Sequence, residues 1–387
     1  MRRFLAAAYA FKVFDSFILI FPLYAVMFVD AGLSPVEIAI VLMVWSGVTF
    51  VMQVPAGVLA DRLPRRFVLA AAQATLALCF LVWWLDPHFW GFLIGLALWG
   101  LKSALAGGTF EALLYDELKS AGRAMEYPRI YGRCRAIQAG AVVAASIGAA
   151  AAARFGYGVA LEASIAAVAV SAATALSMPP AARALATADR DYLAHLRQGL
   201  RFAFADRSVL GILAFAAAVV ALGATLEEFW PIFGAKVGLS RAWIALFVGA
   251  QQTIEATASL TAHRLSGVGR RRFYGLILIC GAGLIAAALA FSAPAMALLA
   301  LYSGAMRLID VSFEARLQNA IPSENRATIG SVKSFAAQIG IWALYLVMGP
   351  LAQATSYRTA FMVCGAVALS IGAACLAASA RFRQSAG

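Results

Sequence analysis

Four charged side chains lie deep inside long apolar segments of this 387-residue chain. At 1.5 Å per helical residue, Asp15 lies about 16 Å from the start of its segment and Lys102 about 18 Å from the start of its own. Glu255 and Arg307 lie at similar depths in the second half of the sequence. A charge that faces lipid at the bilayer centre costs about 2.5 to 3.5 kcal/mol, so such side chains face a cavity or each other. We therefore predict two ion pairs, Asp15 with Lys102 and Glu255 with Arg307.

Two interpretations of these pairs stay open. In the functional one they bind a solute and a proton, with Asp15 as the favoured proton carrier, because intramembrane carboxylates commonly relay protons. In the structural one they lock helix packing at a net energetic cost. Further candidates for the solute site are Lys12, Asp310, Gln338 and Trp342. Positive and negative candidates nearly balance, which favours a zwitterionic or weakly charged solute.

The segment that carries Lys102 poses a geometric problem. Lys102 and Glu111 are nine residues apart, which puts them on opposite faces of a straight helix. In the second half, Arg307, Asp310 and Glu314 share one face, so Lys102 and Arg307 cannot both face the cavity if the repeat is exact. A kink at Gly107–Gly108 would allow Lys102 and Glu111 to face the same side.

The elements that hold these residues must be membrane helices. Hydrophobic residues make up 63% of the chain and charged residues only 13%, more apolar than a soluble domain can bury. A helix crosses the hydrocarbon layer with about 20 residues, and we expect twelve such helices, all of them α-helical integral membrane segments. They are Phe4–Val29, Val36–Ala60, Phe67–Leu85, Phe89–Tyr115, Ile130–Ala153, Val159–Met178, Val209–Phe233, Ala242–His263, Phe273–Phe291, Ala295–Asn319, Ile329–Leu351 and Thr359–Ser379.

The net charge of +12 indicates orientation in a bilayer rather than binding to nucleic acid. Arginines and lysines gather on alternate loops, as in Arg62–Arg66 and Lys119–Arg135, whereas the opposite loops carry few of them. By the positive-inside rule, the basic loops and both termini are cytoplasmic. An even number of helices is then required, which twelve satisfies.

No enzymatic constellation is evident, and we predict neither a cofactor nor a metal. The five cysteines are scattered through apolar segments without CxxC spacing, which is typical of packing residues. No GxxxxGK loop occurs in the sequence, so ATP-driven transport is disfavoured.

The two halves of the sequence repeat each other. The fourth predicted helix contains LALW, nine residues, then TFEA, and the tenth contains LALY, nine residues, then SFEA. Such a parallel repeat predicts two six-helix bundles, residues 1–178 and 209–387. Between them, residues 179–208 form a cytoplasmic linker whose leucines and arginines have the spacing of an amphipathic helix at the membrane surface,.

The stretch GVLADRLPRR (Gly57–Arg66) resembles the loop signature between helices 2 and 3 of the major facilitator superfamily, with Pro64 in place of the second glycine. The resemblance implies a secondary transporter that works by alternating access. It also implies that Asp61 latches this loop against the start of helix 11 near Ile329, where the helix dipole favours a carboxylate. Lys102 stands near a position where proton-driven members carry an arginine. The implied motif residues are Gly57, Asp61, Arg62, Arg65 and Arg66.

Glu111 and Glu314 occupy equivalent places in the two halves, beside the basic loops. Resemblance to sugar-transporting members implies that both glutamates belong to a cytoplasmic gate and pair with loop arginines. The expected partners are Arg62, Arg65, Arg66 and Arg133 in the first half and Arg264, Arg270 and Arg316 in the second.

The sequence thus predicts a proton-coupled secondary transporter of a small organic solute. GGTFEALLYDEL is similar to a group of bacterial members of the superfamily, so we expect a multi-pass monomer in the bacterial cytoplasmic membrane. The solute is unassigned, and import and efflux are both left open. Two alternatives remain: a proton-independent facilitator or lipid flippase, and a receptor or assembly partner that has the fold but transports nothing.

Overall fold

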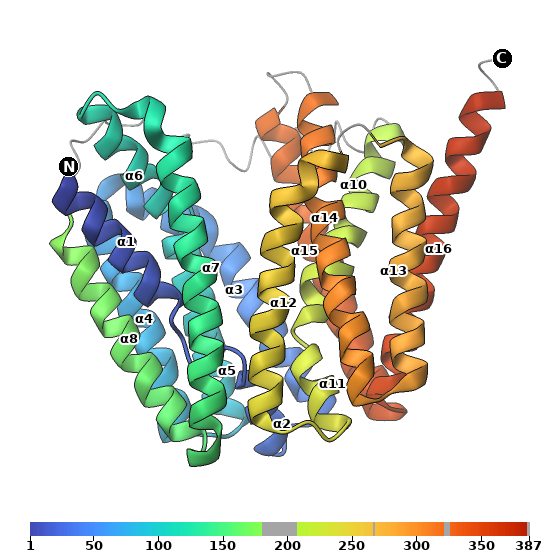
Figure 1. Cartoon of the computed structure of the whole chain (residues 1–387), viewed down its shortest axis with the longest axis horizontal. Helices are drawn as coiled ribbons and strands as arrows, with labels where there is room; N and C mark the ends of the chain where they lie inside the picture. The colour runs from blue at the N-terminus through green and yellow to red at the C-terminus, as the bar shows by residue number, and fades with distance from the viewer. Residues whose placement is uncertain (180–206, 266–267, 321–325, 385–387) are drawn as a thin grey trace. The chain divides into compact units, whose positions relative to one another are not determined.

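The computed structural model describes residues 1–179, 207–265, 268–320 and 326–384. Within these ranges the regular elements are helices, as predicted. The expected amphipathic helix of the linker lies outside the described residues. The longer helices are α1 (Arg2–Ser16), α2 (Tyr24–Asp30), α3 (Pro35–Arg62), α4 (Arg65–Leu85), α5 (Phe89–Ala106), α6 (Thr109–Ser120), α7 (Tyr127–Ala152), α8 (Tyr157–Ser177), α10 (Arg207–Val220), α11 (Trp230–Lys236), α12 (Arg241–Thr261), α13 (Arg270–Ala290), α14 (Met296–Ala320), α15 (Arg326–Ala354) and α16 (Tyr357–Gln384) (Figure 1).

Three of the predicted membrane helices are each divided into two parts. The pairs are α1 with α2, α5 with α6, and α10 with α11. With each pair taken as one crossing, the described helices match the twelve predicted segments. Nine described helices are long and apolar enough to span a membrane by length and composition alone.

The helices form two compact units. One contains the helices up to α8, except the first residues of α3, together with Arg241–Gly249 at the start of α12. The other contains Ser34–Ala39 of α3, the rest of α12 and the remaining described helices.

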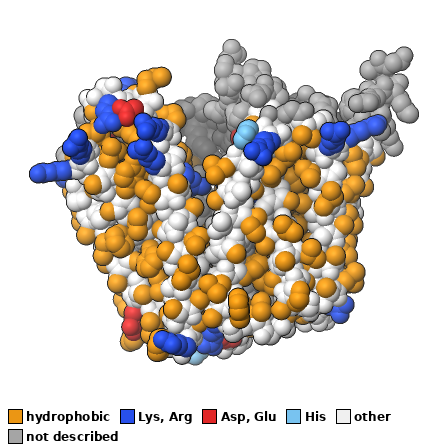
Figure 2. Space-filling view, viewed as in Figure 1, with side chains coloured by type: hydrophobic (Ala, Val, Ile, Leu, Met, Phe, Trp, Pro, Cys, Tyr) orange, Lys and Arg blue, Asp and Glu red, His pale blue; other side chains and the backbone are white. Residues whose placement is uncertain are grey.

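The exposed side chains of the helices are suited to lipid. On the face that Figure 2 shows, hydrophobic side chains are spread over the helices, whereas lysines and arginines lie mainly near the upper and lower edges. Large apolar side chains are widely exposed among the described residues, for example Trp90 at 67%, Leu260 at 77% and Ile279 at 67%. Exposed apolar surface on this scale is typical of proteins whose solvent is the bilayer.

In the first unit, α4 packs chiefly against α5 and α8, and α1 packs against α7 and α8. Trp83 of α4 is fully buried and contacts the rings of Tyr24, Phe28, Phe92 and Trp99. Such aromatic contacts add about 0.5–1.5 kcal/mol each beyond the area they bury. This cluster fixes α4 and α5, the helices that carry the charged site described below.

In the second unit, α13 and α16 run against each other. Their backbones meet at Gly281 and Gly365, where a Cβ on Gly281 would lie 2.9 Å from the Gly365 carbonyl oxygen. Small residues at such contacts allow membrane helices to pack closely. The glycines of this pair are therefore packing residues.

The first predicted helix, Phe4–Val29, is not continuous. It ends as α1 at Ser16 and resumes as α2 at Tyr24, after a segment that contains Pro22. The backbone N–H of Ile20, inside this break, donates a hydrogen bond to the buried Ser164 hydroxyl at 3.1 Å. Proline removes a backbone donor, and neighbouring polar side chains satisfy the groups that a broken membrane helix frees. The break leaves Asp15 in the last turn of α1.

The fourth predicted helix breaks at the two glycines, where a kink was predicted. Gly107 ends α5, and Gly108 precedes α6 in the left-handed conformation, with φ +73°. The break changes the direction in which later side chains point. Lys102 on α5 and Phe110 on α6 consequently both face residues of α1.

We predict that Gly108→Ala lowers the stability of the folded protein by about 1–2 kcal/mol, since a side chain disfavours the left-handed region by that amount. No atom lies within 4 Å of the position that its Cβ would take, so the penalty is conformational rather than steric. Chemical denaturation in detergent measures it. Gly132→Ala in α7 is the control, because that glycine is helical and also faces open space. Equal stability of the two variants would contradict the prediction.

Candidate functional site

The predicted ion pair between Asp15 and Lys102 is present in the first unit. Lys102 Nζ lies 2.9 Å from Asp15 Oδ1, and the two side chains are only 13% and 11% exposed. Gln73 of α4, fully buried, donates a hydrogen bond from Nε2 to the same carboxylate oxygen at 2.6 Å. Three helices, α1, α4 and α5, thus meet at a single carboxylate.

The position of Asp15 makes its partners necessary. The C-terminal turn of a helix carries partial negative charge, which disfavours an anion by about 0.3–1 kcal/mol at exposed sites. Asp15 lies in the last turn of α1, so the helix itself opposes its charge. Lys102 and Gln73 supply the compensating interactions. Loss or movement of either partner would therefore favour the protonated carboxyl group.

Lys12 lies one turn before Asp15 and is 8% exposed. Its ammonium group is 4.1 Å from the centre of the Phe110 ring, whose face stacks against Phe11 at 5.5 Å. Glu111, next to Phe110, accepts a hydrogen bond from the Tyr131 hydroxyl at 3.4 Å. The first unit therefore brings two cations, two carboxylates and a buried amide together around one end of α1.

The second predicted pair, Glu255 with Arg307, forms no direct ion pair among the described residues, although the two groups attract each other electrostatically. Glu255 accepts a hydrogen bond from Gln251 Nε2 at 2.8 Å. Arg307 donates from Nε to the Ser259 hydroxyl at 3.1 Å and lies 3.5 Å from Asp310. Ser259 lies one turn beyond Glu255, and its hydroxyl donates a hydrogen bond to the Glu255 backbone carbonyl. The Ser259 hydroxyl, rather than the Glu255 carboxylate, accepts the hydrogen bond from the Arg307 guanidinium.

Two acidic residues join this cluster that the sequence pattern did not place there. Glu227 and Glu228 lie in the break between α10 and α11, after a π-helical turn at Ala221–Thr225. Both interact electrostatically with Glu255, and Glu227 also does so with Arg307. The two adjacent glutamates and the proline that follows them would have indicated this site only if the break between α10 and α11 had been predicted.

The two uncharged candidates lie on α15. Gln338 is 8% exposed. The Trp342 indole nitrogen is buried without a hydrogen-bond partner among the described residues. Unpaired buried donors are rare in folded proteins, so Trp342 can donate to a bound molecule.

The motif loop follows α3, and its ion pair is one that the sequence did not predict. Arg65, at the start of α4, pairs with Asp116 of α6, while Arg66 donates to the Met178 carbonyl at 3.3 Å. Asp61 is exposed, and Gly57 faces open space. The latch between Asp61 and helix 11 joins residues of the two units and stays a prediction. Arg62 ends α3.

Both gate glutamates form contacts that were not predicted. Glu111 binds Tyr131 rather than an arginine, because Arg65 is held by Asp116. Glu314 pairs with Lys333 of α15, which the sequence analysis overlooked. Arg316 instead donates to the carbonyl groups of Leu265 and Val268, and Arg133 and Arg264 are exposed. The side chain of Arg270 lies outside the described part of the structure.

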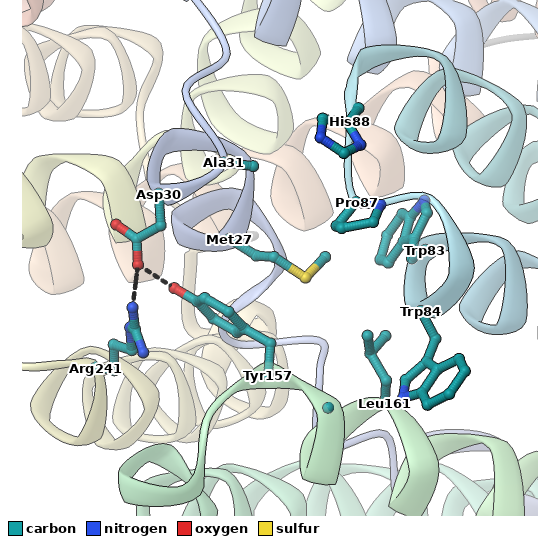
Figure 3. A pocket seen from close by; sticks show the side chains of 11 residues that line it. Met27, Asp30, Ala31, Trp83, Trp84, Pro87, His88, Tyr157, Leu161 and Arg241 are labelled. Atoms are coloured by element: carbon teal, nitrogen blue, oxygen red, sulfur yellow. Dashed lines mark hydrogen bonds and ion pairs between the residues drawn. The ribbon is translucent and has the colours of Figure 1, made fainter.

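A pocket of about 510 Å³ lies in the first unit, at the end of α8 where Tyr157 stands. On its wall, Asp30 Oδ2 accepts hydrogen bonds from Tyr157 at 2.5 Å and from Arg241 at 2.7 Å (Figure 3). Trp84 and His88 line the opposite side. None of the deep charges of the first unit lines this pocket, so it is separate from the Asp15 cluster.

Within the described residues, no three His, Cys, Asp or Glu side chains converge as metal ligands would. The chemistry available to the clusters is therefore proton exchange, ion pairing and hydrogen bonding with a polar solute.

A helical membrane fold with buried charge clusters in each half is typical of a secondary transporter. The sequence model of the Major Facilitator Superfamily matches residues 5–342, and the chain belongs to that family. It is therefore a membrane transporter rather than an enzyme. No curated protein sequence matches the chain.

Solved transporter structures share the fold. A point mutant of the nucleoside transporter NupG aligns with a TM-score of 0.78 at 16% identity, covering 97% of this chain and 98% of its own. A bacterial homologue of the human lysosomal transporter Spinster gives 0.72 at 16% identity, with 97% and 96% covered. A D-xylose–proton symporter gives 0.68 at 13% identity, with 96% of each chain covered. Identities this low establish the fold and leave the solute open.

Proposed function

We propose that the chain is a proton-coupled secondary transporter, which moves a small organic solute across the bacterial cytoplasmic membrane by alternating access. The observation that carries this proposal is the buried group of Asp15, Gln73 and Lys102. A carboxylate held by one ammonium and one amide can exchange a proton when either contact loosens. Burial away from lipid is typical of intramembrane charges that act in transport.

In the proposed cycle Asp15 carries the proton and Lys102 responds to it. Protonation removes the negative charge, so the Lys102 ammonium becomes available to the solute. Deprotonation restores the ion pair and releases the solute. A proton that enters under a membrane potential of about 100 mV supplies about 2.3 kcal/mol, which sustains roughly a fifty-fold solute gradient.

We assign the second unit a role in solute contact, through Glu255, Arg307, Asp310, Gln338 and Trp342. Residues 1–178 and 209–387 are the two bundles, both termini are cytoplasmic, and the protein works as a monomer. The family shares this parallel repeat of two six-helix halves. The proposed cytoplasmic gate consists of the loop arginines and of two ion pairs near the loops, Arg65 with Asp116 and Lys333 with Glu314.

The first experiment identifies the solute and tests its coupling. Purified protein is melted with a library of cationic, anionic, zwitterionic and neutral metabolites, and a ligand at 100 times its Kd adds about 2.7 kcal/mol of stability. The best ligand is then supplied to proteoliposomes with an imposed proton gradient. We expect accumulation above the external concentration, abolished by a proton ionophore. Equilibration without accumulation would indicate a facilitator, and no transport of any bound ligand would indicate a receptor.

A further inference from the structure

Lys12 is a buried cation that forms no direct ion pair among the described residues. It is 8% exposed, and none of the ion pairs or hydrogen bonds within the described part of the first unit involves it. Its ammonium group rests on the Phe110 ring at 4.1 Å and lies 5.9 Å from the Phe11 ring. An aromatic face attracts a cation, but it leaves the ammonium hydrogens without an oxygen acceptor. The ammonium group therefore lacks the direct contact with a counter-ion that buried charges in folded proteins normally have.

The two neighbouring carboxylates are already engaged. Asp15 is bound by Lys102 at 2.9 Å and by Gln73 at 2.6 Å, and Glu111 accepts the Tyr131 hydroxyl. Both carboxylates attract the Lys12 ammonium group electrostatically, but neither contacts it as an ion pair. An anionic oxygen that enters from outside the protein would supply that direct contact.

A second unpartnered atom lies in the same cluster. The Gln73 side chain is fully buried, and its Oε1 accepts no hydrogen bond among the described residues. Buried amide oxygens are almost always satisfied. A solute that carries a hydroxyl or amine donor as well as an anionic group would serve both Gln73 and Lys12.

We propose that Lys12 recognises an anionic oxygen group of the transported solute, either a carboxylate or a phosphate. This inference rests on the proposed transport function and specifies a solute that carries an anionic group, which includes organic anions and zwitterions. Lys12 acts as the fixed positive charge, while the Asp15–Lys102 pair exchanges the proton. A phenylalanine ring beneath the ammonium holds it in place without neutralising it.

The test compares anions with uncharged counterparts of the same shape. Thermal stability of the full-length protein in detergent is measured with benzoate against benzamide, lactate against lactamide, and glycerol 3-phosphate against glycerol. We expect at least one anion to raise the melting temperature more than its neutral counterpart. In Lys12→Met that preference is lost, with Kd rising about 10- to 150-fold, the range for a hydrogen bond to a charged group.

Two variants keep the test independent of folding. Lys12→Arg retains the positive charge and is expected to keep a preference for the same anion. Lys119→Met removes an exposed lysine of α6 in the same unit and should leave binding unchanged. If no anion outperforms its counterpart, or if the preference persists in Lys12→Met, the proposal is overturned. If an anion binds through Lys12 but its transport moves no protons, the anion site stands and proton coupling is refuted. If transport is proton-coupled but unchanged in Lys12→Met, proton coupling stands and the anion site is refuted.

Discussion

Asp15→Asn is expected to abolish accumulation of the solute while leaving downhill exchange intact. Asparagine has nearly the same shape as aspartate and its amide oxygen still accepts a hydrogen bond from Lys102, but it cannot carry a proton. For a solute without net charge, such as a zwitterion, a one-proton cycle at about 100 mV sustains roughly a fifty-fold gradient, so the accumulation ratio should fall from about that value to one. Counterflow of labelled solute, which needs no proton, should persist in the variant.

Asp86→Asn is the control for this experiment. Asp86 is half exposed and, within the described residues, pairs with the exposed His88 between α4 and α5, so its replacement removes a carboxylate of the same unit outside the cluster. Uphill transport by Asp86→Asn should equal that of the wild type. Accumulation of wild-type size in Asp15→Asn would remove Asp15 from the coupling mechanism.

The second large effect concerns stability. Lys102→Met leaves the Asp15 carboxylate buried without its counter-ion, and breaking a buried pair in this way costs about 3–5 kcal/mol. The double variant Asp15→Asn with Lys102→Met has no buried charge at these positions. Replacing both members of a buried pair by uncharged groups is often neutral or stabilising. We therefore expect the double variant to recover most of the stability lost in Lys102→Met, and to fail in uphill transport.

Chemical denaturation of the wild type, the two single variants and the double variant measures this coupling as a double-mutant cycle. Additive losses, with the double variant the least stable of the four, would show that the 2.9 Å contact contributes no interaction energy. The transport result of the double variant separates the two roles of the pair. Recovered stability without transport assigns the pair to function, whereas recovered stability with full transport assigns it to packing.

The Asp15–Lys102 pair was predictable because depth in the membrane limits where a charge can find a partner. Both residues lie near the middle of apolar segments, and a charge there must avoid lipid. Gln73 was not predictable by that argument. A single glutamine in an apolar helix has no charge to balance, and only the packing of α4 against α1 reveals its contact with Asp15.

Glu255 and Arg307 attract each other but are not in direct contact, because the depth of a residue predicts its level in the membrane and not its partner. Ser259 and Asp310 lie at nearly the same level, and each is one turn from a member of the expected pair. Short side chains on neighbouring turns compete for a guanidinium with many donors. In the same way, Arg65, which was expected to pair with Glu111, pairs with Asp116 instead.

Composition and the length of the apolar segments predicted the number and type of helices, whereas the sequence predicted the helix breaks only in part. Gly107 and Gly108 indicated the break in helix 4, because two adjacent glycines have no side chains to stabilise a helix. Pro22 and Pro231 were visible in the sequence, but a proline in a membrane helix commonly bends it without ending it. The breaks place Asp15 at a helix end and bring Glu227 near Glu255, and neither position follows from a continuous helix.

The measurement that tests proton coupling most directly is proton movement during solute transport. Proteoliposomes with pyranine inside report their internal pH while the best-stabilising solute is added outside, with no imposed pH gradient. We predict a solute-dependent pH change in the wild type, and none in Asp15→Asn although the solute still equilibrates. Solute movement in the wild type with constant internal pH would contradict the account and indicate a proton-independent transporter.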